Sequence, residues 1–532
     1  MGQDDASRQA ERLRDAAMDD PTDPMGLADD LAALAAHDQP AVRRLAVEGL
    51  CELAETSIDP VEPVLDVVFD ALDDPDSETV REAVNVVAIV SDEDPSLVQP
   101  VASDLCRLLE EDRRGTSEAA AVALWPIAWT TPGEVVEAVD PLRRLLTRPE
   151  QATRLSAVAV LRGIASEHPE VCVRATEDLI ERCFDRRQNV RVMATAALGP
   201  LATVFPGRIQ PAVPRLVRCL DDGDGRVRQN VAAVVQQIVK AYPEVSLDHH
   251  AAFVSLLDDE NEETRTSASN VLTTVADYRP GVLSDHLETL VRATGDEDTR
   301  VAANLYLGLA TIGWTQPEEL VDHLDPLADG LTRTEGVSHN AAYLLGVLAE
   351  TYPVVVADYL DALFEQLTGG VDRVSRNAAW AVAVIAEDQP AAVERYRHLL
   401  VQALDDDYVA VRGNAGIALG LLGNPPETAV EAVLDMLADG GDPHDVRLAS
   451  SALVALTDAS TQVSVGDLPV EAVLDLLSAD NPQVRANACI ALGNLGVQTA
   501  LDDLYECQTD TEPEVRDAAK SAVEQVHGRR AD

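Results

Sequence analysis

The sequence predicts an all-α protein, a right-handed superhelix built from about 14 stacked pairs of α-helices. Three observations support this fold class. A short motif recurs about every 36 residues, each repeat contains two stretches with apolar residues at helical spacing, and the apolar residues are mainly small and aliphatic, since only 3% of residues are aromatic. Strand-like alternation of apolar and polar residues is absent from the sequence.

The recurring motif is a short acidic turn, then Val/Thr-Arg-x-x-Ala, then a helix rich in Ala and Leu. Its arginine position serves as the reference point of each repeat. The successive reference positions are Arg43, Arg81, Glu118, Arg154, Arg191, Arg228, Arg265, Arg300, Ser338, Ser375, Arg412, Arg447, Arg485 and Arg516. Such regular spacing is typical of a solenoid, in which each repeat buries its apolar face against its neighbours.

Residues 59–95 illustrate the two helices of one repeat. Apolar residues recur every three or four positions in both: Val64, Val67, Val68 and Leu72 in the first helix, and Val80, Ala83, Val84, Val87 and Val90 in the second. Residues 73–77 form the turn, whose Asp and Ser side chains can cap the second helix. Prolines that cannot continue a helix follow the second helix at Pro95, Pro169, Pro243, Pro353 and Pro390.

The repeats divide the chain into three segments. Residues 23–528 are predicted to form the solenoid. Residues 1–22 form an N-terminal tail or short helix that contains both acidic residues and Arg, and residues 529–532 form a C-terminal tail.

The segment DNPQVRANACIALGNLG, residues 480–496, resembles the second helix of HEAT repeats, which carries the pattern D-x-x-x-V-R-x-x-A-x-x-A-L. The resemblance extends over practically the whole chain and implies a HEAT/armadillo-like solenoid. This family includes adaptors, transport receptors, enzyme regulators and a few enzymes, so the resemblance is specific for fold and not for function. The repeats at Glu118, Ser338 and Ser375 lack the arginine, and Arg376 is a substitute one place later.

The resemblance also implies a structural role for the motif arginines, because in HEAT proteins they typically pair with a turn aspartate of an adjacent repeat. The acids Asp221, Asp222, Asp258 and Asp259 are candidate partners. We refer to the arginines as the arginine ladder: Arg43, Arg81, Arg154, Arg191, Arg228, Arg265, Arg300, Arg412, Arg447, Arg485 and Arg516. A two-point Arg–carboxylate pair fixes the register between repeats more than it adds stability.

The chain is strongly acidic, with 93 acidic and 41 basic residues and a formal net charge of -52. The only lysines are Lys240 and Lys520. This composition resembles that of proteins from halophiles, in which molar salt screens the repulsion between acidic side chains. Seven cysteines without a C-x-x-C motif, no secretory signal and no membrane-spanning apolar run predict a cytoplasmic protein without a disulfide framework.

A basic segment interrupts the acidic chain. Residues 141–230 contain 15 Arg and ten acidic residues, a local excess of +5. Arg186, Arg187 and Arg215 are candidate contacts for an acidic protein or a phosphate-bearing molecule. The alternative is that these arginines belong to the ladder or pair locally.

Two further sets of residues are candidate partner contacts. Trp125 and Trp129 lie one helical turn apart around Pro126, which we expect to interrupt the helix, so they either anchor a partner or fill the core at the kink. Asn340, Asn377, Asn414 and Asn487 share one repeat position just before the motif Ala. Armadillo arrays hold extended peptides with columns of Asn amides, although the Trp that accompanies them there is loosely matched only by Trp380.

A dipeptide recurs on the first helices. Asp248-His249, Asp285-His286 and Asp322-His323 lie 37 residues apart, and Asp358-Tyr359 continues the series. Stacked repeats would place these side chains in a column about 10 Å apart, too far for one metal ion to join them directly. The column is either a row of polar edges and hydrogen bonds between repeats, or a metal-binding or pH-sensitive surface.

The sequence contains no P-loop, no H-E-x-x-H motif, no nucleophile elbow and no His-Glu dipeptide of the kind that HEAT-type di-iron hydroxylases use. We therefore predict no enzymatic activity, no cofactor and no metal. The predicted function is a non-catalytic scaffold or adaptor that binds another protein on an extended concave surface lined by second helices, without contact to membranes. The alternatives are a regulatory or lyase-type subunit acting on another enzyme or its cofactor and, less favoured, nucleic-acid binding through residues 141–230.

Overall fold

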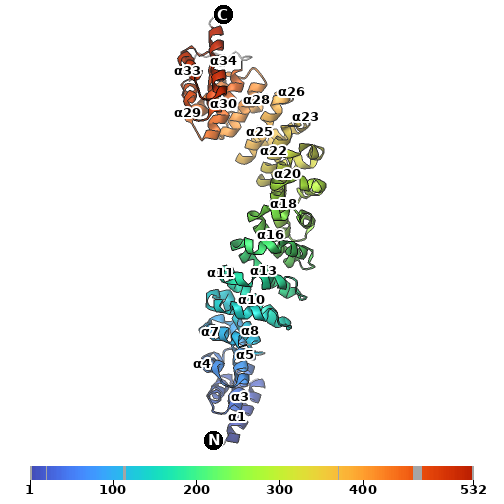
Figure 1. The fold of residues 1–532 in the computed structure, drawn as a ribbon, viewed down its shortest axis with the longest axis vertical. Coiled ribbons are helices and arrows are strands. Elements are labelled where there is room, and N and C mark those ends of the chain that lie inside the picture. Colours follow the sequence, from blue (N-terminus) through green and yellow to red (C-terminus); the bar gives the residue numbers. More distant parts are fainter. Residues whose placement is uncertain (1–2, 20, 112–114, 370, 459–469, 530–532) are drawn as a thin grey trace. The chain divides into compact units, whose positions relative to one another are not determined.

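The computed structural model of the chain describes residues 3–19, 21–111, 115–369, 371–458 and 470–529 (Figure 1). Within these ranges the regular structure is helical and includes no β-strand, as predicted. The chain divides into two compact units, Met1–Val271 and Leu272–Asp532, with the boundary inside one helix. Each unit is a stack of helix pairs.

The first unit contains seven pairs, in which a shorter first helix precedes a longer second helix. The first helices are α2 (Pro24–Ala35), α4 (Leu65–Asp70), α7 (Ala102–Glu110), α9 (Val139–Leu145), α12 (Thr176–Arg182), α15 (Val213–Leu216) and α17 (His250–Ser255). The second helices are α3 (Pro40–Thr56), α5 (Ser77–Glu93), α8 (Thr116–Thr130), α10 (Gln151–Glu167), α13 (Gln188–Val204), α16 (Gly225–Ala241) and α18 (Glu262–Tyr278). Helix α18 contains the boundary between the units.

The second unit also contains seven pairs. Its first helices are α19 (Leu287–Ala293), α21 (Leu324–Ala328), α24 (Leu360–Gly369), α27 (Arg397–Ala403), α29 (Glu427–Asp439), α31 (Glu471–Asp475) and α33 (Leu501–Cys507). Its second helices are α20 (Thr299–Thr315), α22 (Glu335–Ala349), α25 (Asp372–Asp388), α28 (Val409–Leu421), α30 (Pro443–Thr457), α32 (Pro482–Leu495) and α34 (Pro513–Arg529). The described residues therefore confirm the predicted series of 14 pairs.

Short helical turns complete many of the repeats. Single turns that begin with proline follow several second helices: α6 (Pro95–Val98), α11 (Pro169–Cys172), α14 (Pro206–Ile209), α23 (Pro353–Val356) and α26 (Pro390–Val393). These prolines start a new turn directly after a second helix ends, because a proline at the first helical position gives up no hydrogen bond.

The first helix of a repeat is less regular than its apolar pattern predicts. In residues 59–73 the structure has a 3-10 turn at Glu62–Val64, helix α4 and a second 3-10 turn at Ala71–Asp73. Val68 and Leu72 are buried, as expected, whereas Val64 and Val67 are only half-buried. The second helix follows the prediction closely, and its apolar residues Val80, Ala83, Val84, Val87 and Val90 are all buried.

An aspartate before the second helix fixes where that helix begins. The backbone N–H of Thr79 donates to Asp76 at 3.0 Å, which caps the start of α5. Asp224 and Asp298 cap α16 and α20 in the same way. Each cap satisfies a backbone donor that has no partner within the first helical turn.

The N-terminal segment extends the stack of the first unit. Residues 3–18 of the predicted N-terminal tail form helix α1 (Gln3–Met18), whose Ala6 and Ala10 pack against Val42 and Leu45 of α3. The predicted C-terminal tail, residues 529–532, lies outside the described residues except for Arg529, which ends α34. None of the described helices is long and apolar enough to cross a membrane.

Candidate protein-binding surface

The arginine ladder joins consecutive repeats in both units. In the pairs that bridge two repeats, the guanidinium Nε donates to an aspartate that in most cases lies 31 residues later in the chain. The distances are 2.5 Å for Arg43 and Asp74, 2.7 Å for Arg154 and Asp185, 2.7 Å for Arg191 and Asp222, 2.5 Å for Arg228 and Asp259, and 2.9 Å for Arg485 and Asp510. Of the acids named from the sequence, Asp222 and Asp259 are thus partners of ladder arginines.

Each of these arginines also binds its own repeat. Arg154 Nη1 donates to the backbone carbonyl oxygen of Arg148, six residues earlier, at 2.9 Å. The same contact over six residues occurs at Arg191, Arg228, Arg265, Arg412, Arg485 and Arg516. A ladder arginine therefore closes the turn of its own repeat while it holds the turn of the next.

The electrostatics of the pairs follow from this geometry. Burial by itself would raise the pKa of the Asp185 carboxyl. Hydrogen bonds from Arg154 and from the backbone N–H of Arg187 outweigh this effect, so the pKa lies below its ordinary value. The hydrogen bond to Asp185 in turn raises the pKa of Arg154. Both groups are therefore charged at neutral pH, and the pair is nearly removed from solvent, with side-chain exposures of 11% and 3%.

Several arginines placed in the ladder form other contacts. Arg81 pairs with Glu78 and Glu82 of its own helix, and residue 112, the position of its expected partner, lies outside the described residues. Arg300 pairs with Asp298 of its own turn. Arg412 and Arg447 form no ion pair with a described residue, because the positions 31 residues later are Pro443 and Ser478. Arg516 binds the carbonyl oxygens of Asp510 and Thr511 in its own repeat.

Other arginines replace the ladder where the motif departs from its pattern. Arg333, in the turn before α22, reaches back and donates to the carbonyl oxygens of Thr294 and Asp296 in the preceding turn. Arg376 reaches forward, and its guanidinium carbon lies 5.2 Å from the ring centroid of Tyr408 in the next turn. The register between repeats is therefore retained at Ser338 and Ser375 by different chemistry.

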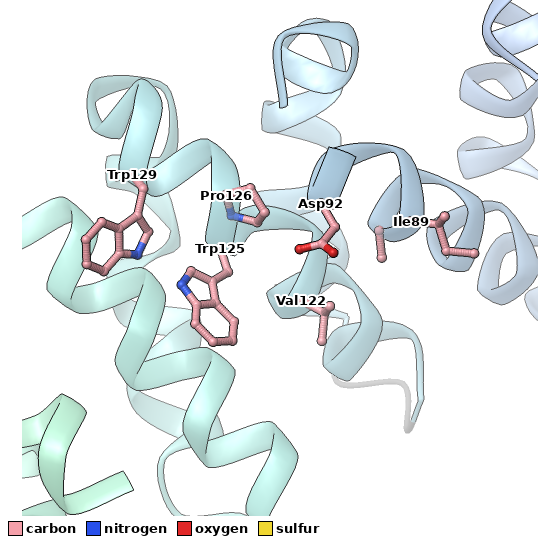
Figure 2. A pocket seen from close by; sticks show the side chains of 7 residues that line it. Ile89, Asp92, Val122, Trp125, Pro126 and Trp129 are labelled. Atoms are coloured by element: carbon pink, nitrogen blue, oxygen red, sulfur yellow. The ribbon is translucent and has the colours of Figure 1, made fainter. Parts of the chain in front are cut away.

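A groove in the first unit is lined by the second helices α5 and α8 (Figure 2). Its volume is about 450 Å³, and its walls consist of Ala88, Ile89, Asp92, Val122, Trp125, Pro126 and Trp129. Trp129 is 49% exposed and Trp125 is half-buried. The pair thus lines an open groove and does not fill the core, and α8 runs through Pro126 without the predicted interruption.

A second groove lies entirely in the second unit, across α22, α25, α28 and α30, with a volume of about 590 Å³. Its aromatic wall is formed by Tyr343 and Trp380, whose rings stack with centroids 5.7 Å apart. Trp314 extends this cluster, since its ring centroid lies 6.4 Å from that of Trp380 and its Nε1–H donates to the Tyr343 hydroxyl at 3.0 Å. The Trp314 side chain is 51% exposed.

A glycine makes room for this aromatic cluster. A Cβ on Gly346 of α22 would collide with the six-membered ring of Trp380 from α25. The absence of a side chain at Gly346 therefore lets the indole lie flat on the preceding helix. Our sequence interpretation treated Trp380 only as a loose match and missed Trp314 and Tyr343. The available signal was that Tyr343 and Trp380 lie 37 residues apart, one repeat length, and so must stack.

The second groove also carries unpaired charge. Glu350 and Glu387 line it, and neither carboxylate forms an ion pair with a described residue. Burial and, to a lesser extent, the Glu387 carboxylate raise the pKa of Glu350. The groove therefore combines an aromatic wall with side chains of both charges, since Arg376 and Arg447 line it as well, and the aromatic wall suits an apolar side chain of a partner.

The asparagine column mainly connects repeats. Asn340 donates to the carbonyl oxygen of Ala303 at 2.8 Å, and Asn377 donates to that of His339 at 2.9 Å, both in the preceding second helix. Asn487 donates to the hydroxyls of Ser450 and Ser451, whereas Asn414 donates to Ala410 in its own helix. Asn377 and Asn414 nevertheless line the second groove.

The basic segment is partly neutralised by local pairs. Arg215 donates to Glu181 at 2.6 Å, and Arg143, Arg154, Arg174, Arg182, Arg191, Arg226 and Arg228 also form ion pairs. Arg186 and Arg187 are exposed and form no ion pair with a described residue. Arg215 and Arg218 both lie against the ring of Phe184, at 5.6 Å and 5.9 Å.

The recurring Asp-His dipeptides lie at the starts of first helices, with half-buried imidazoles and exposed carboxylates. Tyr359, which continues the series, forms a hydrogen bond to the preceding repeat: its hydroxyl donates to Asp325 at 2.6 Å. Burial, followed by that hydrogen bond, raises the pKa of Tyr359 to about 12. The described residues contain no group of three His, Cys, Asp or Glu side chains that could hold a metal ion.

Comparison with protein families agrees with this repeat architecture. The model for HEAT repeats matches residues 452–524, and the model for the non-SMC mitotic condensation complex subunit 1 matches residues 189–303. The chain is a HEAT-repeat solenoid. A comparison of this HEAT-repeat chain with curated proteins found no match.

Solved structures show the same fold. One similar chain belongs to a structure of Kap95p with RanGDP; it has a TM-score of 0.54 and 15% identity, and the alignment covers 97% of the HEAT-repeat chain and 76% of that chain. Another belongs to work on a phosphorylation switch between cadherin and beta-catenin; it has a TM-score of 0.57 and 15% identity, with 87% and 99% covered. At this identity the likeness concerns the fold alone.

Proposed function

We propose that this HEAT-repeat chain is a non-catalytic scaffold that binds another protein along the exposed faces of its second helices. The observation that carries the proposal is the aromatic cluster of Trp314, Tyr343 and Trp380 beside a groove of about 590 Å³. Large aromatic side chains at an open groove are the residues that most often dominate the energy of protein–protein contacts.

The surrounding structure supports this role. Aromatic residues make up only 3% of the chain, and yet Trp314 is half exposed. Leaving so large an apolar side chain in contact with water gives up the stabilisation that its burial would provide. The groove spans four consecutive second helices, which provides the extended contact surface typical of solenoids. Charged side chains of both signs also line the groove, Glu350 and Glu387 as well as Arg376 and Arg447, and they can pair with polar groups of a partner at its rim.

The net charge supports a second part of the proposal, that the scaffold works in concentrated salt. With a formal charge of -52, long-range attraction would be screened under those conditions. Binding would then depend on direct apolar and aromatic contacts, which is the kind of contact that the groove offers.

Affinity capture at molar KCl tests the proposal. The wild-type chain should retain a stoichiometric protein from the lysate of its own source, and Trp380→Ala should weaken that retention by tenfold or more, since loss of a central aromatic contact costs about 2 kcal/mol. Tyr278→Ala is the matched control, because Tyr278 is 57% exposed on a second helix and does not line the groove.

The captured protein must be identified by mass spectrometry and then purified for titration. Equal affinity for the wild type, Trp380→Ala and a Trp314→Ala variant would contradict the assignment of the groove. Circular dichroism of each variant separates loss of binding from loss of the fold.

A further inference from the structure

The groove in the first unit contains a feature that its apolar lining does not explain. Arg162 of α10 stacks on Trp129, with its guanidinium carbon 4.7 Å from the ring centroid. Its Nη1 also donates to the sulfur of Met193 at 3.4 Å. No carboxylate of the described residues pairs with this half-buried guanidinium.

This lack of an ion pair distinguishes Arg162 from the ladder arginines Arg154, Arg191 and Arg228, which pair with aspartates. Burial lowers the pKa of Arg162, whereas hydrogen bonds to aspartates raise the pKa of Arg154, Arg191 and Arg228. A partly desolvated charge without a counter-ion is unfavourable unless a ligand supplies that ion. Arg162 does not itself line the groove, but it stacks on Trp129, which does, and the one charged side chain of the groove lining is Asp92.

Three charged or aromatic features follow one another across consecutive second helices. Asp92 of α5 is exposed and forms no ion pair with a described residue. Trp125 and Trp129 of the next second helix, α8, provide the apolar surface (Figure 2). Arg162 belongs to α10, the second helix that follows α8. Helix α8 contacts both α5 and α10. A ligand that follows this line therefore meets a carboxylate, then aromatic rings, then a guanidinium.

We propose that this strip binds an extended segment of a partner protein that places an apolar side chain on Trp125 and Trp129 and an acidic side chain against Arg162. The inference rests on the proposed scaffold function and names the chemistry of one docking site. Two helix spacings amount to about 16 to 20 Å, which an extended chain spans with about five or six residues. A basic residue at the other end of the segment would lie near Asp92.

A second copy of this chain is a poorer occupant. Two chains that each carry a formal charge of -52 repel one another, and at high salt that repulsion is screened without becoming attractive. The guanidinium also selects against a purely apolar segment, because covering Arg162 without a carboxylate would complete its desolvation.

Peptide display on the full-length chain tests the proposal. A library of random decapeptides is selected against the wild type, and peptides with an acidic residue within about three positions of a large apolar residue should be enriched. Isothermal titration of the enriched peptide should then show an affinity loss of about tenfold or more for Arg162→Gln, as expected for loss of a charge-assisted hydrogen bond. Trp129→Ala should cause a similar loss, and Asp92→Asn a smaller one, since an exposed ion pair contributes little.

The controls distinguish this site from the other groove. Arg279→Gln removes an exposed arginine that lies outside both the strip and the basic segment, and it should leave the affinity unchanged. Arg162→Lys keeps the charge but loses the planar contact with Trp129, so it should restore only part of the affinity. Light scattering of the wild type and Arg162→Gln tests the second copy as occupant, and an assembly that depends on Arg162 would overturn the proposal.

Two other results would also overturn it. The first is selection of no peptide, or of peptides without acidic residues. The second is an enriched peptide that binds Arg162→Gln as tightly as the wild type. If peptide binding depends on Trp380 and not on Trp129 or Arg162, the inference fails while the scaffold function stands; if it depends on neither groove, both fail.

Discussion

Arg154 holds Asp185 at two points: Nε lies 2.7 Å from Oδ2 and Nη2 lies 3.0 Å from Oδ1. The two residues belong to consecutive repeats, and the same guanidinium reaches the carbonyl oxygens of Arg148 and Pro149 in its own turn. One side chain thus joins two turns, and its loss affects both repeats at once.

Breaking this pair should destabilise the first unit. Arg154→Met removes the two short hydrogen bonds to the buried Asp185 carboxylate and leaves only the longer 3.4 Å contact with Arg182 and the backbone N–H of Arg187, which costs about 3 kcal/mol. Local hydrogen exchange of α10, α12 and α13 measures this cost, because repeats open locally. The matched control is Arg186→Met, at an exposed arginine without an ion pair, which should change stability by less than about 0.5 kcal/mol. Equal protection in both variants would contradict the structural role of the ladder.

The contribution of this pair should depend on pH in a defined direction. The folded-state pKa of Asp185 lies below its unfolded value, so the stabilisation is fully present above an unfolded pKa of about 3.9 and is lost as the pH falls through the lower folded value. Asp185→Asn keeps an acceptor for the backbone N–H of Arg187 but removes the charge. The stability difference between wild type and Asp185→Asn, from chemical denaturation, should be constant from pH 7 to 5 and shrink below pH 4. A constant difference down to pH 2.5 would refute it.

We expect Arg333 to take over the role of the ladder arginine in the repeat where Ser338 stands at the motif position. Because its guanidinium donates to two carbonyl oxygens of the preceding turn, Arg333→Met should destabilise the second unit by about 2 kcal/mol. Hydrogen exchange of α19, α20 and α22 checks this expectation. Ser338→Ala is the control, since the Ser338 hydroxyl donates only to Glu335 within its own helix. A larger effect for Ser338→Ala than for Arg333→Met would reverse the assignment.

Two glycines of α22 should respond oppositely to alanine. Gly346→Ala should displace the Trp380 ring, with a loss of about 1 to 3 kcal/mol from overpacking and a changed tryptophan fluorescence spectrum. Gly336→Ala adds a methyl group where nothing lies within 4 Å and should raise helix stability by up to about 1 kcal/mol. Thermal unfolding and fluorescence of both variants provide the comparison. An unchanged spectrum for Gly346→Ala would show that the ring does not lie on this glycine.

Salt should stabilise the chain. Repulsion among side chains with a formal net charge of -52 opposes folding, and raising KCl from 0.15 to 1 M shortens the Debye length from about 8 to 3 Å. The melting temperature should therefore rise with KCl, most steeply below about 1 M. A melting temperature that stays level or falls over this range would contradict adaptation to high salt. Sorbitol at equal osmolality controls for a general solute effect.

The repeat pattern was enough to predict the fold, because spacing and helical periodicity are local properties of the sequence. The 14 helix pairs and the buried second-helix stripe at Val80 to Val90 follow from that pattern. The division of the first helix into α4 and two 3-10 turns does not, because apolar spacing of three residues fits both helix types.

The candidate site was harder to predict, because it depends on contacts between repeats. The sequence identified Trp125 and Trp129 but not whether they face the core or the surface, and it gave no reason to place Arg162 on Trp129. The asparagines were recognised by their shared position, although their amides mostly join neighbouring repeats. Register alone places side chains in columns, and only packing decides which of them contact each other.

The contact between Gly346 and Trp380 has a consequence for transplanting the aromatic surface. A tryptophan moved alone into another repeat would meet a side chain on the helix before it, unless that helix also carries glycine at the corresponding place. The smallest portable piece of this surface is therefore two neighbouring repeats, moved together. The same requirement applies whether the surface is grafted by design or a single repeat is exchanged by a change in the sequence.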